Sequence, residues 1–286
     1  MSDSLSVVIP AYNEEKGIGK VLVELNDVLN KTGLAHEIIV VDDGSEDATA
    51  KIVQGNEFVK LVQHPANKGY GSSLKTGIRN ATGKWILITD ADGTYPVKDI
   101  PRLLEHIGNY DMVVGARTGK DVNIPLYRRP AKKILAWLAN YLAETNIPDI
   151  NSGMRVFRKE DALKFFSILP KGFSFTTTIT MAYLSNDYTI KYLPIDYYRR
   201  HGVSKISPIR DFVNFAVLMI RTVAYFNPLK VFLPASIIFF VAGFLVLLYQ
   251  IILYRNIADL PVMLLLAALQ IGLMGLLADL IVRKRL

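Results

Sequence analysis

The first half of the chain alternates between two hydrophobic patterns. Short apolar runs lie within residues 5–10, 36–45, 59–64, 84–92 and 111–117. Between them, apolar side chains recur at helical spacing in residues 18–29, and further helices are predicted in 47–53, with Asp47 as N-cap, and in 71–83. Strands that alternate with helices are typical of a mainly parallel sheet with helices on both faces. The first half therefore predicts an α/β domain.

Polar residues follow four of these runs at the point where each predicted strand ends. They form the sequences PAYNE (10–14), DDGS (42–45), DAD (90–92) and GAR (115–117). The carboxyl ends of parallel strands meet at one edge of a sheet, and ligands bind in the crevice there. We therefore expect these polar groups to converge on one binding site.

The pattern changes near residue 229, after which almost every side chain is apolar. Residues 231–254 carry no charge, and residues 260–282 carry one, Asp279. Each stretch exceeds the ~20 residues that span a bilayer as a helix. Only five residues, RNIAD, separate the two stretches, so an antiparallel hairpin of two transmembrane helices is favoured over two buried core helices.

The charges that flank this hairpin predict its orientation. Lys230 precedes the first stretch, and Arg283, Lys284 and Arg285 follow the second. Basic residues gather on the cytoplasmic side of a membrane. We therefore expect an integral membrane protein with its N-terminal domain on the cytoplasmic face.

Residues 207–229 link the two parts. Their large apolar side chains keep to one side of a helix: Phe212, Phe215, Met219, Val223 and Phe226. This pattern favours either an interfacial amphipathic helix along the membrane or a linker helix packed on the domain. The predicted organisation is a domain at 1–206, this segment at 207–229 and a membrane hairpin at 230–286.

Composition narrows the classes of partner. The 286 residues have 51% hydrophobic content and a mean hydropathy of +0.26, and the excess lies in the C-terminal stretches. With no cysteine, disulfides and thiolate metal sites are excluded. The net charge of +7 suits anionic lipids or phosphorylated substrates. Nucleic acid is not expected as a partner, because no recognition motif is found.

Asp90 and Asp92 carry the strongest chemical signal. At positions i and i+2 of an extended chain, their side chains point the same way and repel each other. A bound Mg²⁺ or Mn²⁺ relieves that repulsion, and such hard cations keep positions for substrate phosphates. A pair of plain turn acids is the alternative, but the position after a buried strand favours the metal site.

Two other motifs indicate a nucleotide. Asp42 and Asp43 end a second strand, where carboxylates either accept hydrogen bonds from a nucleoside or cap a turn. A glycine-rich turn with Lys68 opens the helix predicted at 71–83, and helix N-termini favour anionic groups. The chain lacks both the P-loop sequence and the G-x-G-x-x-G fingerprint, so neither a P-loop nucleotidase nor a dinucleotide enzyme is supported.

Together, these motifs resemble a known family. VVIPAYNEE, VVDDGSEDAT, NKGYGSSLKTGI and TDADGTYP, in this order, resemble glycosyltransferase family 2 with the GT-A fold. DINSGMRVFRK, RRHGVSK and the two C-terminal stretches are similar to the polyprenyl-phosphate glycosyltransferases, the group of dolichyl-phosphate mannose synthase and its bacterial glucosyl relatives. The resemblance implies a Rossmann-like, mainly parallel sheet, followed by an interfacial helix and a transmembrane hairpin.

The resemblance also implies roles on the donor side. Pro10, Tyr12 and Glu14 would bind the base and ribose, with Asp42 or Asp43, and Lys68 would lie near the nucleotide. Asp90 and Asp92 would hold Mg²⁺ or Mn²⁺ on the donor diphosphate. The family often has Gln two residues after the second Asp, as a further ligand. Thr94 takes that place here, a neutral oxygen ligand, which implies a different metal affinity or preference.

Basic residues would bind the remaining phosphates. Arg117, Arg129, Lys132 and Arg155 would receive the phosphate of the acceptor lipid. Arg199, Ser204 and Lys205 match the R-x-x-G-x-S-K segment of the family, which would close over the donor diphosphate. A solvated surface charge is the alternative for each arginine, and it is most credible for Arg128, Arg158 and Arg200.

The implied reaction is an inverting transfer of a hexose, mannose or glucose, from a GDP- or UDP-sugar to dolichyl or undecaprenyl phosphate. Asp90, Asp92 and Arg117 would be its catalytic residues. Two alternatives stay open: a family 2 enzyme that glycosylates a hydroxyl of a glycolipid or polysaccharide, and a non-catalytic membrane scaffold or sugar-nucleotide sensor. The sugar, the nucleotide, the polyprenol and a homo-oligomeric state also stay open.

Overall fold

A computed structural model describes residues 4–119, 140–141, 144–172, 174–198, 217, 220–256 and 258–283. The chain divides into two compact units, residues 1–216 and 217–286. Each unit is described by itself. The predicted interfacial helix at 207–229 lies mostly outside the described residues and stays a prediction.

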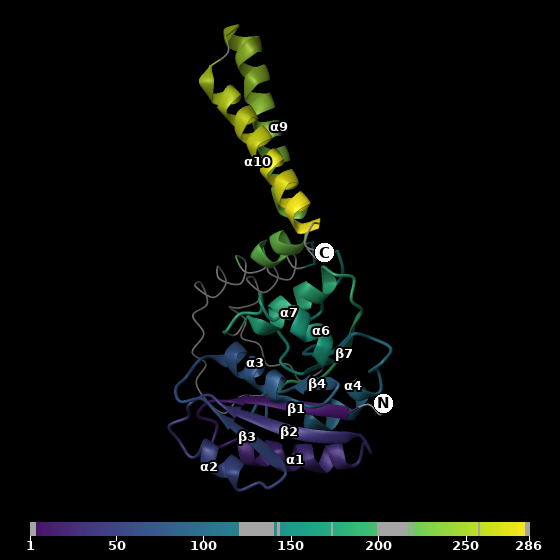
Figure 1. Ribbon diagram of the computed structural model, residues 1–286. Helices are drawn as coiled ribbons and strands as arrows, with labels where there is room; N and C mark the ends of the chain where they lie inside the picture. The colour runs from purple at the N-terminus through teal and green to yellow at the C-terminus, as the bar shows by residue number, and fades with distance from the viewer. Residues whose placement is uncertain are drawn as a thin grey trace. The chain divides into compact units, whose positions relative to one another are not determined.

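The first unit alternates strands and helices, as the sequence predicts. Its strands are β1 (Ser4–Ala11), β2 (Ala35–Asp42), β3 (Val59–Gln63), β4 (Trp85–Ile88), β5 (Met112–Ala116), β6 (Arg155–Arg158) and β7 (Ile190–Pro194) (Figure 1). Its helices are α1 (Ile18–Asn30), α2 (Thr49–Gln54), α3 (Tyr70–Asn80), α4 (Ile100–Leu104), α6 (Lys159–Lys164) and α7 (Phe175–Leu184), with a 3-10 turn η1 (Val97–Asp99).

The strands form one sheet in the order β3-β2-β1-β4-β6-β5-β7. All neighbouring strands are parallel except β6, which runs antiparallel to β4 and β5. Arg155, the first residue of β6, pairs with Ile88 near the end of β4 and with Val114 near the end of β5. The residues just before β6 therefore lie at the same sheet edge as the carboxyl ends of β4 and β5.

Helices cover both faces of this sheet (Figure 1). Helix α1 buries Ile18, Leu22, Leu25 and Leu29 at helical spacing, in one core cluster with Val7 of β1. Burial of each such side chain contributes about 1.5–3 kcal/mol, so Leu22→Ala costs about 2–5 kcal/mol. On the opposite face, α3 approaches so closely that a Cβ at its Gly77 would collide with Val8 of β1.

The start of α2 differs from the prediction by one residue. The N-cap is Ala48, not Asp47. The Asp47 carboxylate instead accepts the N–H of Thr49 at 2.9 Å and the N–H of Glu15 at 3.1 Å. Asp47 therefore ties the start of α2 to the loop that follows β1.

The second unit contains an antiparallel helical hairpin of α9 (Leu229–Tyr254) and α10 (Asp259–Arg283) (Figure 1). Small residues lie between the two helices: a Cβ at Gly243 would come within 2.9 Å of Leu264, and one at Gly275 within 2.7 Å of Phe232. The Ser236 hydroxyl donates to the Ala268 carbonyl oxygen at 2.7 Å. Such small and hydroxyl residues allow close packing of membrane helices. Both helices are long and apolar enough to cross a membrane.

Candidate active site

The acid pair lies directly after β4, which ends at Ile88. Tyr70, at the start of α3, donates its hydroxyl to Asp90 Oδ1 at 3.2 Å. The Thr94 hydroxyl donates to Asp92 Oδ1 at 2.7 Å, and its side chain is fully buried. Each carboxylate therefore accepts a hydrogen bond from a neighbouring hydroxyl, which restrains its orientation.

The surroundings of Asp90 and Asp92 fit a hard divalent cation. Gly153 has no side chain to fill the space beside Asp90, where a Cβ would lie 3.0 and 3.1 Å from the two carboxylate oxygens. No cluster of three or more His, Cys, Asp or Glu side chains occurs among the described residues. Mg²⁺ is often held by one or two carboxylates with water and substrate phosphates, and the acid pair has that donor chemistry.

The loops that follow β1 and β2 are joined to each other. The N–H groups of Asn13 and Glu14 donate to Ser45 Oγ and Thr49 Oγ1, at 2.9 and 2.8 Å. In return, the Glu46 N–H donates to Asn13 Oδ1 at 2.8 Å. Pro10, Tyr12 and Glu14, assigned to the nucleotide by the sequence, lie at the end of β1 and in this joined loop.

Asp42 and Asp43 are both buried at the end of β2. Asp42 accepts the Ser45 N–H at 3.2 Å. The Asp43 carboxylate forms a hydrogen bond with His64 Nδ1 at 2.7 Å. It also accepts hydrogen bonds from the N–H groups of Lys68 and Gly69, at 3.0 and 2.8 Å. Burial alone would raise the pKa of Asp43, but these hydrogen bonds outweigh it and lower the pKa.

The glycine-rich turn differs from the prediction of an open anion site. The N–H groups of Lys68 and Gly69 bind Asp43, and the N–H of Ser72 donates to the Lys171 carbonyl oxygen at 2.9 Å. A Cβ at Gly71 would come within 2.8 Å of the Gly172 carbonyl oxygen, so glycine allows this approach. These N–H groups donate to protein acceptors and not to a phosphate. The Lys68 side chain is exposed, and its role near the nucleotide stays a prediction.

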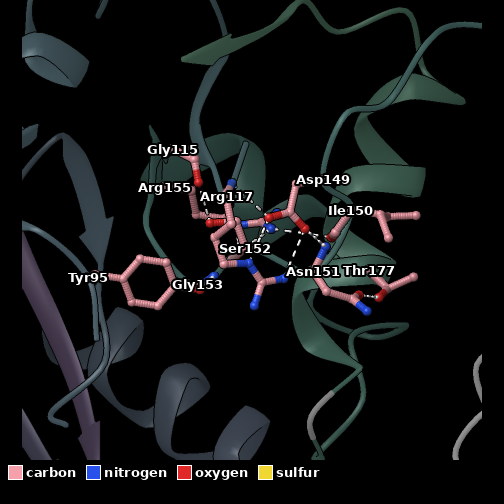
Figure 2. A network of polar contacts seen from close by, with 10 residues as sticks. All are labelled: Tyr95, Gly115, Arg117, Asp149, Ile150, Asn151, Ser152, Gly153, Arg155 and Thr177. Atoms are coloured by element: carbon pink, nitrogen blue, oxygen red, sulfur yellow. Dashed lines mark hydrogen bonds and ion pairs between the residues drawn. The ribbon is translucent and has the colours of Figure 1, made fainter. Parts of the chain in front are cut away.

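Arg117 follows β5 and forms an ion pair with Asp149 (Figure 2). Its Nε and Nη2 donate to the two carboxylate oxygens at 2.7 and 2.9 Å, and its backbone N–H donates at 3.0 Å. The guanidinium also lies 5.1 Å from the ring centre of Tyr197, which packs edge-on against Tyr95. Burial alone would lower the pKa of Arg117, but Tyr95 and Asp149 raise it above its ordinary value, so the cation is retained.

Sequence reasoning gave no role to Asp149 or Tyr197. Asp149 lies in the DINSGMR segment, which was noted for its arginine. The order of β4, β6 and β5 brings Asp149 to the sheet edge, and a single sequence does not encode this order visibly. The one signal in the sequence was an acidic residue, Asp149, six positions before Arg155.

Arg155 corrects the prediction. It was expected to bind the acceptor phosphate, but it is fully buried. Its guanidinium donates to the carbonyl oxygens of Ser152 and Thr176 and to the Thr180 hydroxyl. Arg155 therefore fixes the segment before β6 from inside the protein, and its burial withdraws the guanidinium from a lipid phosphate.

The chain after β7 returns to the acid pair. The Tyr198 N–H donates to the Thr94 carbonyl oxygen at 2.9 Å, and the Gly119 N–H donates to the Ile195 carbonyl oxygen at 3.0 Å. The segment of Arg199, Ser204 and Lys205 follows directly in the sequence. These three residues, with Arg129 and Lys132, lie outside the described residues.

Two family models match two separate parts of the chain. Residues 6–166 match the model of glycosyl transferase family 2. Residues 227–283 match the model of the GtrB C-terminal hairpin. The two matches cover the domain with the acid pair and the helical hairpin, respectively.

Two curated relatives come from Haloferax volcanii. The chain is 30% identical to the low-salt glycan biosynthesis hexosyltransferase Agl6 over 217 residues, which cover 74% of this chain and 52% of the relative. The chain therefore spans about half the length of Agl6. It is 32% identical to a dolichyl-phosphate hexose transferase over 208 residues, which cover 72% of this chain and 88% of the relative.

Among solved structures, the chain resembles glucosyl-3-phosphoglycerate synthase of Mycobacterium tuberculosis in complex with Mn²⁺, UDP and glucosyl-3-phosphoglycerate. The TM-score is 0.59 at 20% identity, with 77% of this chain and 78% of the other covered. At this identity the likeness concerns the fold alone. It confirms the predicted fold class, a GT-A α/β domain.

Proposed function

The chain belongs to glycosyl transferase family 2, and on that premise we propose that it transfers a hexose, mannose or glucose, from a GDP- or UDP-hexose to the phosphate of a dolichyl or undecaprenyl lipid. One observation carries the proposal: the acid pair after β4 and Arg117 after β5 flank the same end of β6. Cation-binding and anion-binding groups are thus close together, as a reaction between two phosphate-bearing substrates requires.

On the donor side, Asp90 and Asp92 hold Mg²⁺ or Mn²⁺ against the donor diphosphate. When bound, the metal ion neutralises charge on the departing nucleoside diphosphate. Tyr12, Glu14 and Asp42 contact the nucleoside beside Pro10, and the exposed Lys68 side chain reaches the phosphates. Asp43 acts indirectly, because its oxygens accept the N–H groups of Lys68 and Gly69 and so hold that turn in place. Arg199, Ser204 and Lys205 close over the diphosphate.

On the acceptor side, Arg117 binds the lipid phosphate, with Arg129 and Lys132. Asp149 accepts hydrogen bonds from two N–H groups of the Arg117 guanidinium, and these bonds fix the orientation of the guanidinium plane. A phosphate oxygen attacks the anomeric carbon, and the bond from that carbon to the diphosphate breaks. A single displacement inverts the configuration, so an α-linked donor gives a β-linked lipid.

The reaction has no need of a general base. The second pKa of a phosphate monoester is about 6, so the nucleophile is already an anion at neutral pH. A hydroxyl acceptor would need a carboxylate to remove its proton. Asp149 is poorly suited to that task, because both of its oxygens pair with Arg117. Asp149 is therefore not the base that a hydroxyl acceptor would require.

The helical hairpin gives the domain access to its lipid. Lys230 and Arg283 lie at the two ends of the hairpin that are not joined by the turn. Under the positive-inside rule, these ends and the catalytic domain lie on the cytoplasmic face. The acceptor phosphate, held at that surface by its own lipid tail, then meets a tethered enzyme.

A donor screen tests the function. Purified full-length protein in detergent is incubated with Mg²⁺ or Mn²⁺, a polyprenyl phosphate and each of several GDP- and UDP-hexoses. Mass spectrometry is expected to detect one polyprenyl-phosphate hexose, formed only with metal and lost in Asp92→Ala. A sugar product that forms only when a hydroxyl acceptor is supplied would overturn the assignment of the acceptor, and tight nucleotide binding without turnover would overturn the assignment of an enzyme.

A further inference from the structure

Thr94 joins the acid pair to the segment after β7. Its hydroxyl and its backbone N–H both donate to Asp92 Oδ1, at 2.7 and 3.1 Å. Its carbonyl oxygen accepts the N–H of Tyr198 at 2.9 Å. The Thr94 side chain is fully buried. One residue therefore contacts Asp92 through its hydroxyl and N–H, and Tyr198 through its carbonyl oxygen.

Two donors on one carboxylate oxygen fix the orientation of the whole carboxylate. Rotation of the Asp92 side chain would break the hydrogen bond from the Thr94 hydroxyl. The bond from Tyr198 holds the backbone of Thr94, from which the hydroxyl reaches Asp92. The Asp92 carboxylate is thus restrained before any ligand arrives, as preorganisation of a binding site requires.

We propose that Thr94 is a positioning residue, which acts on the metal ion through Asp92 and not as a ligand of its own. The proposal rests on the metal role of Asp92 in the proposed function. It replaces the role that the family pattern implied for Thr94. A Gln at this position can reach a cation with its own oxygen, whereas the short Thr94 side chain uses its hydroxyl proton on Asp92.

The carbonyl of Thr94 adds a second consequence. Thr94 thus links Asp92 to Tyr198, one residue before Arg199. The residue that orients the Asp92 carboxylate therefore also holds the Tyr198 backbone. No other described hydrogen bond between backbone groups joins the loop at 90–96 to residues 195–198.

The test is a Mn²⁺ titration of full-length protein in detergent, in which electron paramagnetic resonance measures the free ion. It is run with Mn²⁺ alone and again with GDP or UDP. Thr94→Ser, which keeps the hydroxyl, is expected to bind Mn²⁺ within about twofold of wild type. Thr94→Val is expected to bind about tenfold more weakly or worse, since the loss of a partner that orients a metal ligand costs about 10–100-fold.

Thr82→Val is the matched control, because the Thr82 hydroxyl also donates to a carboxylate, Glu37, at 2.6 Å. Glu37 lies at the other end of β2 from Asp42, so this variant is expected to bind Mn²⁺ as wild type does. Melting temperatures are measured for every variant, and Thr94→Ala repeats the comparison if Thr94→Val melts early. Thr94→Gln is expected to bind no better than Thr94→Val, because the position is buried.

The outcomes separate the positioning role from the metal role. If wild type and Thr94→Val bind Mn²⁺ equally, the positioning role is wrong while the metal role stands. If Thr94→Gln binds more tightly than wild type, position 94 faces the ion as a ligand and the proposal is overturned. If wild type binds no Mn²⁺ with or without nucleotide, both the metal role of the acid pair and the positioning role fail.

Discussion

Arg117 and Asp149 form a bidentate ion pair in which two guanidinium N–H groups meet the two oxygens of one carboxylate, at 2.7 and 2.9 Å. Asp149 is 3% exposed, so the pair is largely withdrawn from water. Two parallel hydrogen bonds fix the relative orientation of the guanidinium and the carboxylate. Removal of either residue would leave the other as an unpaired buried charge. Asp149 thus sets the direction of the Arg117 guanidinium, which the proposed function assigns to the acceptor phosphate.

Arg117→Lys keeps the charge but removes the planar fork and the stacking on Tyr197. A hydrogen bond to a charged group contributes about 1.5–3 kcal/mol. We therefore expect the KM for polyprenyl phosphate to rise about tenfold or more, with nucleotide affinity unchanged. Steady-state kinetics at varied lipid concentration measures this. The control is Arg102→Lys, whose exposed ion pair with Asp99 is worth little. An unchanged KM in Arg117→Lys would remove Arg117 from the acceptor site.

Gly153→Ala tests the space beside Asp90. The new Cβ would lie 3.0 and 3.1 Å from the Asp90 oxygens, so the carboxylate must shift. We expect Mn²⁺ to bind about tenfold more weakly, since the loss of the correct orientation of a metal ligand typically costs about 10–100-fold in metal affinity. Gly172→Ala is the control, because a Cβ there meets no atom within 4 Å. Mn²⁺ titration and thermal melting of both variants distinguish a local effect from loss of the fold.

Asp43→Asn tests the anchor of the glycine-rich turn. Hydrogen bonds lower the pKa of Asp43 below its ordinary value of 3.8, so ionised Asp43 stabilises the fold above that value. This contribution is lost as the pH falls through the lowered folded-state pKa. We therefore expect the melting temperature of Asp43→Asn to lie below that of wild type at pH 7, and the gap to shrink below about pH 4.

The exposed Asp27 on α1 provides the control for that series. Asp27→Asn is expected to melt within about 1 °C of wild type at every pH, since most exposed substitutions change stability by less than ~0.5 kcal/mol. A gap for Asp43→Asn that stays constant from pH 7 to pH 3 would mean that its charge has no part in the stability.

The hairpin can be tested with a disulfide, because the chain has no cysteine of its own. An ideal Cβ at Gly272 lies 3.8 Å from the Ser236 Cβ, which matches the mean Cβ separation of disulfides. The double variant Ser236→Cys/Gly272→Cys is expected to form a disulfide on mild oxidation. Cleavage between α9 and α10 at an inserted protease site then leaves the fragments joined until a reductant is added. The pair Ile252→Cys/Gly272→Cys, with Ile252 74% exposed, is expected to stay reduced.

Much of the fold follows from periodicity. The first five strands and the two long helices lie where the apolar runs predict them, and α1 lies where apolar side chains recur at helical spacing. Helix α3 begins at Tyr70 and ends at Asn80, three residues before the predicted end at residue 83. Buried strands read as continuous apolar runs, and the carboxyl end of each run carries polar residues that local sequence alone identifies. The acid pair after β4 was found in this way, and the family resemblance then gave it a role.

The remaining features depend on contacts between distant segments. Arg155 looks like any other basic residue until the carbonyl oxygens that surround it are known. The N–H groups of the glycine-rich turn could not be recognised as occupied without Asp43 and Lys171. Asp149 and Tyr197 reach Arg117 through the strand order, which no single segment encodes.

The reversed strand β6 brings one long connection to the sheet edge where the acid pair lies. Strands β1, β2 and β4 are complete by Ile88, whereas β5 ends at Ala116 and β6 begins at Arg155. The connection from β5 to β6 leaves and re-enters the sheet at the same edge, because β6 runs antiparallel to both of its neighbours. Under the proposed function, a change of acceptor through residues of this connection would leave the strands that precede Asp90 and Asp92 as they are.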